Sequence, residues 1–190
     1  MEQPDVKLHV LPGGIMPKRQ TEGAIGYDVH LRAIVSPFNM DKNQPLLRET
    51  LFDFKSMPEN PMIAGHVLVQ MDEVVYRMAP GESVLVGIGF VCEMPFPMFY
   101  WVAPRSGLAA KWGITVTNAP GTVDPDYRGE AGVLVYNRTN NHFDLRWGMR
   151  IAQVIFQIAL IPNFTEVKEM SEFSETKRSV SGFGSTGLNK

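Results

Sequence analysis

The densest group of reactive side chains lies in residues 118–130, which read NAPGTVDPDYRGE. Two carboxylates, Asp124 and Asp126, flank Pro125 and precede Tyr127. A carboxylate at the end of a strand can act as a general base toward water. The same residues are also typical of an ordinary β-turn, because Asp, Pro and Gly are common turn residues. This segment alone therefore leaves a hydrolytic site and a turn as open interpretations.

A second group, Pro104-Arg105-Ser106-Gly107, combines a guanidinium, a hydroxyl and a glycine. We expect a short helix over residues 106–112, with Ser106 as its N-cap. A guanidinium can bind two phosphate oxygens at once, and the N–H groups at a helix start point toward the same anion. The group indicates an anion site, with a capped helix and a solvated Arg as the alternative. Ser106 is not in a G-x-S-x-G elbow, which argues against a nucleophile.

The C-terminal segment 182–187 reads GFGSTG and matches G-x-G-x-x-G literally. No strand precedes it and no helix can follow it, so a dinucleotide-binding site is not supported. A donor-rich tail with Arg178 nearby can still close over a phosphate ligand as a lid. Phe183 can stack on a base. The alternative is a disordered tail.

Asp28 follows Gly26-Tyr27 at the start of an expected strand, where a lone Asp is usually a turn or cap residue. The four histidines are scattered at positions 9, 30, 66 and 142. Their spacing supports neither a zinc site nor a Ser-His-Asp triad.

The elements that must position these residues are short and rich in β-forming side chains. The chain has 190 residues, of which 44% are hydrophobic, with 17 Gly and 14 Pro. This composition favours a globular fold with many turns. We expect an all-β sandwich, barrel or jelly roll, with a second, weak helix over residues 48–55. The expected strands are residues 7–11, 27–35, 67–71, 83–91, 99–103, 114–118, 132–137 and 150–161.

The net charge of −2 gives no global basic field for nucleic acid or anionic lipid. The one cysteine, Cys92, excludes an intramolecular disulfide and is expected to be a small buried hydrophobe. No signal peptide and no membrane-spanning apolar run is visible. We expect a cytoplasmic protein, in the host cytoplasm if a virus or phage encodes it, and neither nucleic acid nor membrane as partner.

Taken in order, five segments resemble the five motifs of trimeric dUTPases. They are AIGYDV at residues 24–29, PRSGLA at 104–109, the segment 118–130, RIAQVIF at 150–156 and the tail 178–187. The resemblance implies a jelly-roll-like β-barrel subunit in a homotrimer, with active sites between subunits that a neighbour's tail completes. It also implies Mg²⁺-dependent hydrolysis of dUTP to dUMP and pyrophosphate, which removes dUTP from the nucleotide pool and supplies dUMP for dTMP synthesis.

The resemblance assigns roles to individual residues. Asp124 matches the aspartate that activates the attacking water, and Asp126 would be structural. Tyr127 matches the residue that packs under deoxyribose and leaves no room for a 2′-hydroxyl. The hairpin that reads uracil corresponds to Asn118, Gly121, Thr122, Val123 and Gly132.

The resemblance also assigns the residues that contact the triphosphate and the metal. The phosphate contacts correspond to Arg105, Ser106, Gly107 and Gln153. Asp28 matches an acid linked to Mg²⁺ through water, with the metal held mainly by the triphosphate. The tail that clamps the γ-phosphate and covers the base corresponds to Arg178, Phe183, Gly184, Ser185 and Thr186.

The resemblance also sets the expected organisation. We expect one β domain over residues 1–176, with an insertion at 36–65, and a flexible lid over 177–190. The insertion lengthens the stretch between the first two motifs, and the sequence indicates no role for it. Ser179 and Ser181 stand where the family commonly has Gly, and Thr122 is a less common neighbour of the catalytic strand.

Two other functions remain open. A dCTP deaminase, or a bifunctional deaminase and dUTPase, would need a glutamate proton shuttle in the base pocket and a different second motif. A dUTPase-fold regulatory protein would act by binding a partner, for instance through residues 36–65. A nucleic-acid-binding β-domain is disfavoured by the slightly negative charge.

Overall fold

A computed structural model of the chain describes residues 4–177, 179 and 180. The chain divides into two compact units, Met1–Leu160 and Ile161–Lys190. The described part of the second unit contains one short 3₁₀ helix, η1 (Met170–Glu172). The expected boundary between residues 176 and 177 stays a prediction.

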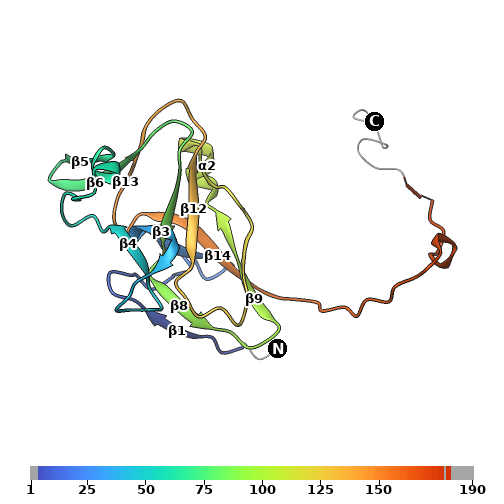
Figure 1. The fold of residues 1–190 in the computed structure, drawn as a ribbon. Coiled ribbons are helices and arrows are strands. Elements are labelled where there is room, and N and C mark those ends of the chain that lie inside the picture. Colours follow the sequence, from blue (N-terminus) through green and yellow to red (C-terminus); the bar gives the residue numbers. More distant parts are fainter. Residues whose placement is uncertain (1–3, 178, 181–190) are drawn as a thin grey trace. The chain divides into compact units, whose positions relative to one another are not determined.

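The first unit is built almost entirely from short strands, as the composition predicts (Figure 1). Its strands are β1 (Lys7–Val10), β2 (Tyr27–His30), β3 (Ala33–Met40), β4 (Arg48–Phe52), β5 (Val67–Gln70), β6 (Glu73–Met78), β7 (Ser83–Gly87), β8 (Phe90–Glu93), β9 (Met98–Pro104), β10 (Ile114–Val116), β11 (Gly121–Val123), β12 (Gly132–Asn137), β13 (Phe143–Leu145) and β14 (Arg150–Ile158). Two short helices, α1 (Pro61–Ala64) and α2 (Ser106–Trp112), accompany them.

Two larger sheets enclose the core. One has the strand order β10-β12-β7-β3-β4 and the other β11-β9-β14-β2, and neighbouring strands in both are antiparallel. The main apolar cluster draws side chains from both sheets, among them Val86 and Val135 from the first and Val102 and Val154 from the second. The sheets therefore pack against each other as the layers of an all-β, jelly-roll-like unit.

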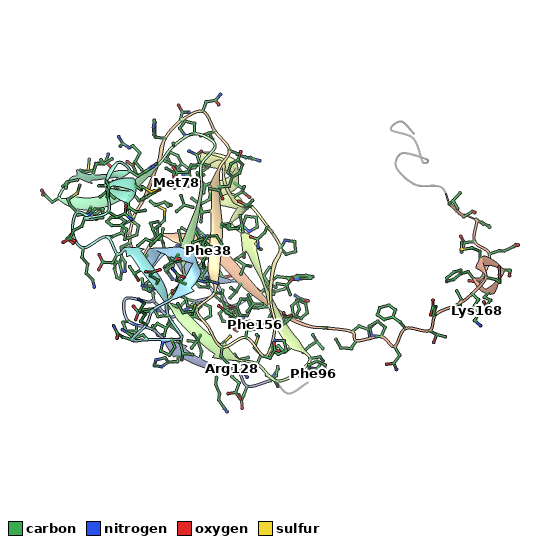
Figure 2. The ribbon with its side chains drawn as sticks, in the orientation of Figure 1. Phe38, Met78, Phe96, Arg128, Phe156 and Lys168 are labelled. Atoms are coloured by element: carbon green, nitrogen blue, oxygen red, sulfur yellow. The ribbon has the colours of Figure 1, made fainter. Side chains whose placement is uncertain are left out.

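Two smaller sheets, β1-β8 and β13-β6-β5, flank this core. Met78 at the end of β6 is fully buried and belongs to the main apolar cluster, so it anchors the β13-β6-β5 sheet to the rest of the unit (Figure 2). The expected insertion, residues 36–65, contains the end of β3, all of β4 and helix α1.

Two local predictions about helices are wrong. Residues 48–55 form no helix, because Arg48–Phe52 pairs with β3 as strand β4. Helix α2 has the predicted residues Ser106–Trp112, but its N-cap is Arg105 and no side chain of a described residue caps it. Gly113 ends α2 with a φ of 65°, a left-handed conformation that favours glycine.

Two predicted strands are each divided in the structure. Residues 27–35 form β2 and β3, because the chain crosses between the two large sheets at Leu31 and Arg32. The Leu31 N–H donates to the Met149 carbonyl at 2.8 Å, and the Arg32 N–H donates to the Gly87 carbonyl at 2.9 Å. Residues 83–91 are likewise interrupted at Gly89, whose φ is 71°.

No helix among the described residues has the length and apolar character needed to cross a membrane.

Candidate functional site

Asp28 of β2 is a buried carboxylate held between two arginines. Its Oδ1 accepts from Arg105 Nε at 2.9 Å, and its Oδ2 accepts from Arg150 Nη1 at 3.0 Å. Arg105 Nη1 also donates to the Arg150 carbonyl at 3.1 Å. We call Asp28, Arg105, Arg150 and Gln153 the arginine cluster. With two guanidinium groups and one carboxylate, it carries a net positive charge.

Gln153 completes this cluster from β14, where it lies opposite Asp28 on one side and Ala103 on the other. Its Nε2 donates to the Pro104 carbonyl at 3.0 Å. A Cβ added at Gly26 would lie 2.1 Å from Gln153 Oε1. Gly26 therefore lets the first motif pack directly against the fourth.

Ser106 and Gly107 follow Arg105 in the first turn of α2, and both are exposed. A Cβ added at Gly107 would meet nothing within 4 Å. The surface beside the two arginines is thus open at this point, as a phosphate site requires.

His30 lies opposite Arg150 on the neighbouring strand. Its Nδ1 is buried and has no hydrogen-bond partner among the described residues. Burial lowers the pKa of His30, and the nearby arginines and Lys18 lower it further, whereas Asp28 opposes them. His30 is therefore a neutral neighbour of the cluster near pH 7.

A second group of residues, most of them predicted site residues, surrounds a hollow of about 220 Å³ on the hairpin. We call it the hairpin hollow, and its lining residues are Arg48, Thr122, Val123, Asp124, Tyr127, Ala131 and Gly132. Asp124 follows β11, is exposed, and its carboxylate accepts no hydrogen bond from a described residue. Asn118 lies close by, with its Nδ2 3.2 Å from the position of a Cβ at Gly121.

Glu130 supports the hairpin hollow from within the protein. Its fully buried carboxylate accepts from Arg32 Nε at 2.7 Å and Arg32 Nη2 at 2.9 Å. It also accepts from the backbone N–H groups of Gly89 and Arg48, at 2.8 and 3.0 Å. The sequence interpretation assigned no role to Glu130, Arg32, Arg48 or Arg150.

The two groups lie at opposite ends of β9. Strand β11 runs antiparallel to β9 with Val123 opposite Tyr100, so Asp124 comes level with Phe99, whereas Arg105 follows the other end. From Phe99 to Arg105 an extended strand covers roughly 20 Å at about 3.3 Å per residue. No hydrogen bond or ion pair between described residues joins the arginine cluster to the hairpin hollow.

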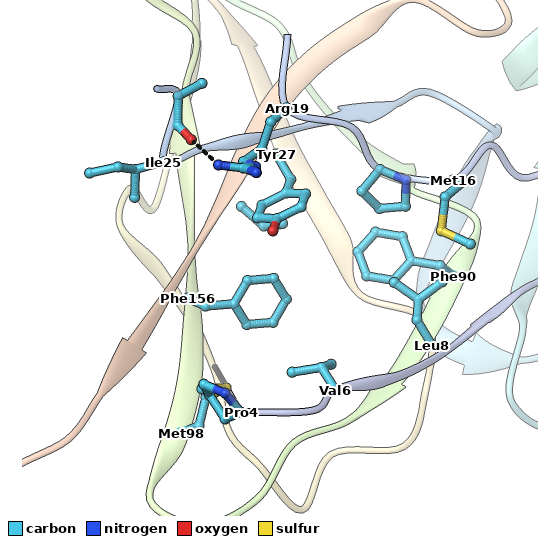
Figure 3. A pocket seen from close by; sticks show the side chains of 13 residues that line it. Pro4, Val6, Leu8, Met16, Arg19, Ile25, Tyr27, Phe90, Met98 and Phe156 are labelled. Carbon is cyan, nitrogen blue, oxygen red and sulfur yellow. Dashed lines mark hydrogen bonds between the residues drawn. The ribbon is translucent and has the colours of Figure 1, made fainter. Parts of the chain in front are cut away.

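A separate apolar groove of about 540 Å³ lies beside the first motif. Tyr27 and Phe156 line it, with their rings edge to face at 5.8 Å (Figure 3). Arg19 borders the groove and donates to the carbonyls of Glu22 and Ala24, at 2.9 and 3.2 Å. None of the described residues that line the groove carries a carboxylate, and Arg19 serves to hold the loop before Tyr27.

Comparison with known proteins decides the family. The dUTPase family model matches residues 54–187. A deoxyuridine 5'-triphosphate nucleotidohydrolase of Heliobacterium modesticaldum is 37% identical over 185 residues, covering 96% of this chain and 94% of that protein. The chain belongs to the dUTPase family.

Solved dUTPase structures share the fold. A mutant of the Staphylococcus bacteriophage 80alpha dUTPase with dUpNHpp superimposes with a TM-score of 0.67 at 16% identity, covering 97% of this chain and 99% of that one. A mutant dUTPase from phage phi11 of S. aureus, described as showing the coordination of a structural Mg(II) ion, has a TM-score of 0.61 at 13% identity. It covers 88% of this chain and 99% of that one. The jelly-roll-like fold predicted for a dUTPase is thus confirmed.

Membership of the dUTPase family agrees with the order of the motifs along the chain. The structure brings the first, second and fourth motifs together in the arginine cluster and places the third at the hairpin hollow. Of the fifth, Arg178, Phe183, Gly184, Ser185 and Thr186 lie outside the described residues. Their roles, like those of the other site residues, remain predictions.

Proposed function

We propose that Asp124 activates the water that hydrolyses dUTP to dUMP and pyrophosphate. The reaction itself rests on family membership: the chain aligns with a deoxyuridine 5'-triphosphate nucleotidohydrolase over 94% of that protein's length. The protein is a hydrolase acting on dUTP. The observation that carries the role of Asp124 is its exposed carboxylate, which is free of described partners at the edge of the hairpin hollow.

The chemical step is an in-line displacement at the α-phosphorus. Asp124 accepts a proton from water, and the water oxygen attacks the α-phosphorus. The bond from this phosphorus to the oxygen bridging the α- and β-phosphates breaks, and pyrophosphate leaves. Because water is a weak nucleophile, its activation and positioning by this carboxylate would supply much of the catalysis.

The nucleoside occupies the hairpin hollow in this proposal. The backbone of Thr122 and Val123 reads the uracil edge, together with Asn118, Gly121 and Gly132. Tyr127 packs under the deoxyribose. A tight hairpin has no space for the C5 methyl of thymine, and the 4-amino group of cytosine would leave a donor of the hairpin unpaired.

The triphosphate binds at the arginine cluster. Donors on both Arg105 and Arg150 remain without a described partner, and Ser106, Gly107 and Gln153 lie beside them. Guanidinium groups bind phosphate oxygens through paired N–H donors. Asp28 is a positioning residue here, because it orients both guanidinium groups.

Mg²⁺ fits this site as an ion carried by the substrate. No group of three His, Cys, Asp or Glu side chains that could hold a metal occurs among the described residues. Both oxygens of Asp28 are already bonded to arginines, so Asp28 can reach a metal only through water. Mg²⁺ characteristically binds substrate phosphates and keeps several waters. When bound, it would neutralise part of the triphosphate charge.

The active site is proposed to lie between subunits of a homotrimer. A carboxylate and an arginine pair at opposite ends of β9, roughly 20 Å apart, cannot both contact the same phosphate within one chain. Association brings the hairpin hollow of one subunit to the arginine cluster of another. The tail 177–190 of a neighbour would then clamp the γ-phosphate and cover the base. We place this trimer in the cytoplasm, in keeping with the single cysteine of the chain.

The direct test is to incubate the purified protein with Mg²⁺ and dUTP, dCTP, dTTP or UTP, and to separate the products by chromatography. We expect dUTP alone to be consumed, giving dUMP and pyrophosphate. The variant Asp124→Asn should bind dUTP but lose hydrolysis by about a hundredfold or more, as expected for a general base. Formation of dUTP or dUMP from dCTP would instead identify a deaminase. No reaction with any nucleotide would point to a binding role.

A further inference from the structure

We propose that Arg48, which the segment 36–65 contributes, determines the discrimination between dUTP and UTP. It forms one wall of the hairpin hollow and holds Tyr127 at the position of the sugar. The inference deepens the proposed hydrolysis of dUTP and rests on it. It also gives a function in the reaction to a segment for which the sequence indicated none.

Arg48 and Tyr127 meet at one backbone atom. The Tyr127 hydroxyl donates to the carbonyl oxygen of Glu130 at 3.0 Å, and Arg48 Nε donates to the same oxygen at 3.1 Å. Both side chains also line the hairpin hollow. The orientation of the tyrosine ring is therefore coupled to the guanidinium of Arg48 through this carbonyl.

Arg48 is held firmly enough to act as a fixed wall. Its backbone N–H donates to Glu130 Oε2 at 3.0 Å, and the Glu130 N–H donates to the Leu46 carbonyl at 2.7 Å. The Glu130 carboxylate is anchored in turn by Arg32. Arg48, at the start of β4, is thus hydrogen-bonded to Glu130 through both its backbone N–H and its side chain.

The approach of Arg48 to the hollow also depends on Gly132. A Cβ at Gly132 would lie 3.1 Å from Arg48 Nε and 2.8 Å from Leu85 Cδ1. Only a residue without a side chain leaves this space. Gly132 therefore allows Arg48 to lie against the third motif, in addition to any contact of its own with the substrate.

Loss of the Arg48 side chain should loosen the sugar position and leave the reacting water untouched. The Glu130 carbonyl would keep one donor instead of two, and the wall beside Tyr127 would open. The 2′-hydroxyl of a ribose would then clash less with the wall of the hollow, and the affinity for dUTP would fall. Asp124 makes no bond to Arg48, so we expect the change mainly in KM and in the preference for dUTP over UTP, with kcat largely kept.

The test compares kcat/KM for dUTP and for UTP in the wild type, Arg48→Ala and Arg48→Met. The matched control is Lys55→Ala, which removes a cation from the same segment. Lys55 is 80% exposed and pairs only with Asp53 among the described residues. We expect the dUTP preference to fall about tenfold in Arg48→Ala, the size expected for one lost hydrogen bond to a charged group, and to stay unchanged in Lys55→Ala.

Arg48→Met guards against a folding defect, because it keeps much of the side-chain length and has no N–H to donate to the Glu130 carbonyl. If Arg48→Ala does not fold, the preference of Arg48→Met decides, and a wild-type value overturns the inference. Tyr127→Phe provides the second arm. Because both side chains act through one carbonyl, the double variant should lose less than the product of the two single losses. Losses that multiply independently would contradict the shared carbonyl.

The outcomes separate this inference from the proposed function. A wild-type protein that hydrolyses dUTP, with an unchanged preference in every folded Arg48 variant, refutes the role of Arg48 and leaves the function standing. A wild-type protein that does not hydrolyse dUTP refutes both.

Discussion

Gly107 and Gly26 both lie beside the arginine cluster, but the space around them differs. A Cβ at Gly107 would point into open space, whereas a Cβ at Gly26 would lie 2.1 Å from Gln153 Oε1. In the proposed complex, the open space at Gly107 is where the triphosphate lies. Alanine at Gly107 therefore tests substrate binding, whereas alanine at Gly26 tests packing.

We expect Gly107→Ala to keep the stability of the free protein and to raise KM for dUTP several-fold. Gly26→Ala should lower both the melting temperature and the activity, because Gln153 must move. Thermal unfolding with and without dUTP, together with steady-state kinetics, measures both effects. A wild-type KM in Gly107→Ala would argue against a phosphate contact at this turn.

His30 should make the stability of the protein depend on pH. Burial lowers its pKa in the folded state below the usual histidine value of 6.5, and the unfolded chain has no such burial. Below the unfolded pKa the unfolded state therefore binds more protons. The stability that neutral His30 contributes is present above that value and is lost as the pH falls through the lower, folded pKa.

The resulting prediction concerns the slope of stability against pH. The wild type should lose stability between pH 7 and about pH 5, a range that brackets an ordinary histidine pKa, and His30→Gln should lose less. Urea unfolding at several pH values measures both slopes. The other charged groups near this ring, Asp28, Arg105, Arg150 and Lys18, are unchanged in the variant. Identical slopes would exclude His30 as the titrating group.

At the scale of elements, Glu130 links segments that are far apart in the sequence. Its carboxylate binds Arg32 before β3, the backbone of Arg48 in β4 and the backbone of Gly89 between β7 and β8. The side chains of Arg32 and Glu130 are only 5% and 0% exposed. Removal of one charge would leave the other buried without its partner.

Glu130→Gln should therefore destabilise the protein by about 3–5 kcal/mol, the usual effect of breaking a buried ion pair on one side. The control is Glu93→Gln, whose ion pair with Lys7 lies at the surface, with side chains 50% and 81% exposed. That change should have little effect. Chemical denaturation of both variants gives the comparison, and equal stabilities would mean that the Arg32–Glu130 pair does not hold the elements together.

The sequence predicts the elements that carry their own local pattern. Strand β12 and helix α2 have the predicted bounds, because an alternating apolar run and a run of good helix formers are visible locally. Strands β6, β11 and β13 were not predicted. Strands β11 and β13 are only three residues long, and β13 depends on distant pairing, Phe143 with Met78. Tertiary pairing decides such strands, so local propensity does not reveal them.

The site residues likewise divide into those that a local motif indicates and those that depend on distant contacts. The order of the motifs led to Asp28, Arg105 and Asp124. Arg48 and Glu130 were not found, because a buried carboxylate gives no local sign of its partners. The Glu130 partners Arg48 and Arg32 lie 82 and 98 positions away along the chain. Arg32 gives no local hint either, because together with Asp28 and His30 it occupies the polar positions of an alternating run.

At the scale of the whole molecule, the central claim is that two subunits share each active site. We infer it from the register of β9 and β11, which places Asp124 and Arg105 at opposite ends of one strand. Closed, symmetric homo-oligomers repeat each interface, so a contact that completes one site would complete every site. A shared site also explains why the arginine cluster and the hairpin hollow are each preformed yet separate within the described chain.

The most direct test is complementation between two inactive variants. Asp124→Asn lacks the proposed base, and Arg105→Ala lacks a phosphate contact, so each alone should have little activity. In mixed trimers from equal co-expression, about a quarter of the sites would combine an intact Asp124 with an intact Arg105 from the other subunit. We predict that activity returns to about a quarter of the wild-type value. Mixed trimers, verified by differently tagged subunits, that stay as inactive as the parents would contradict the shared site.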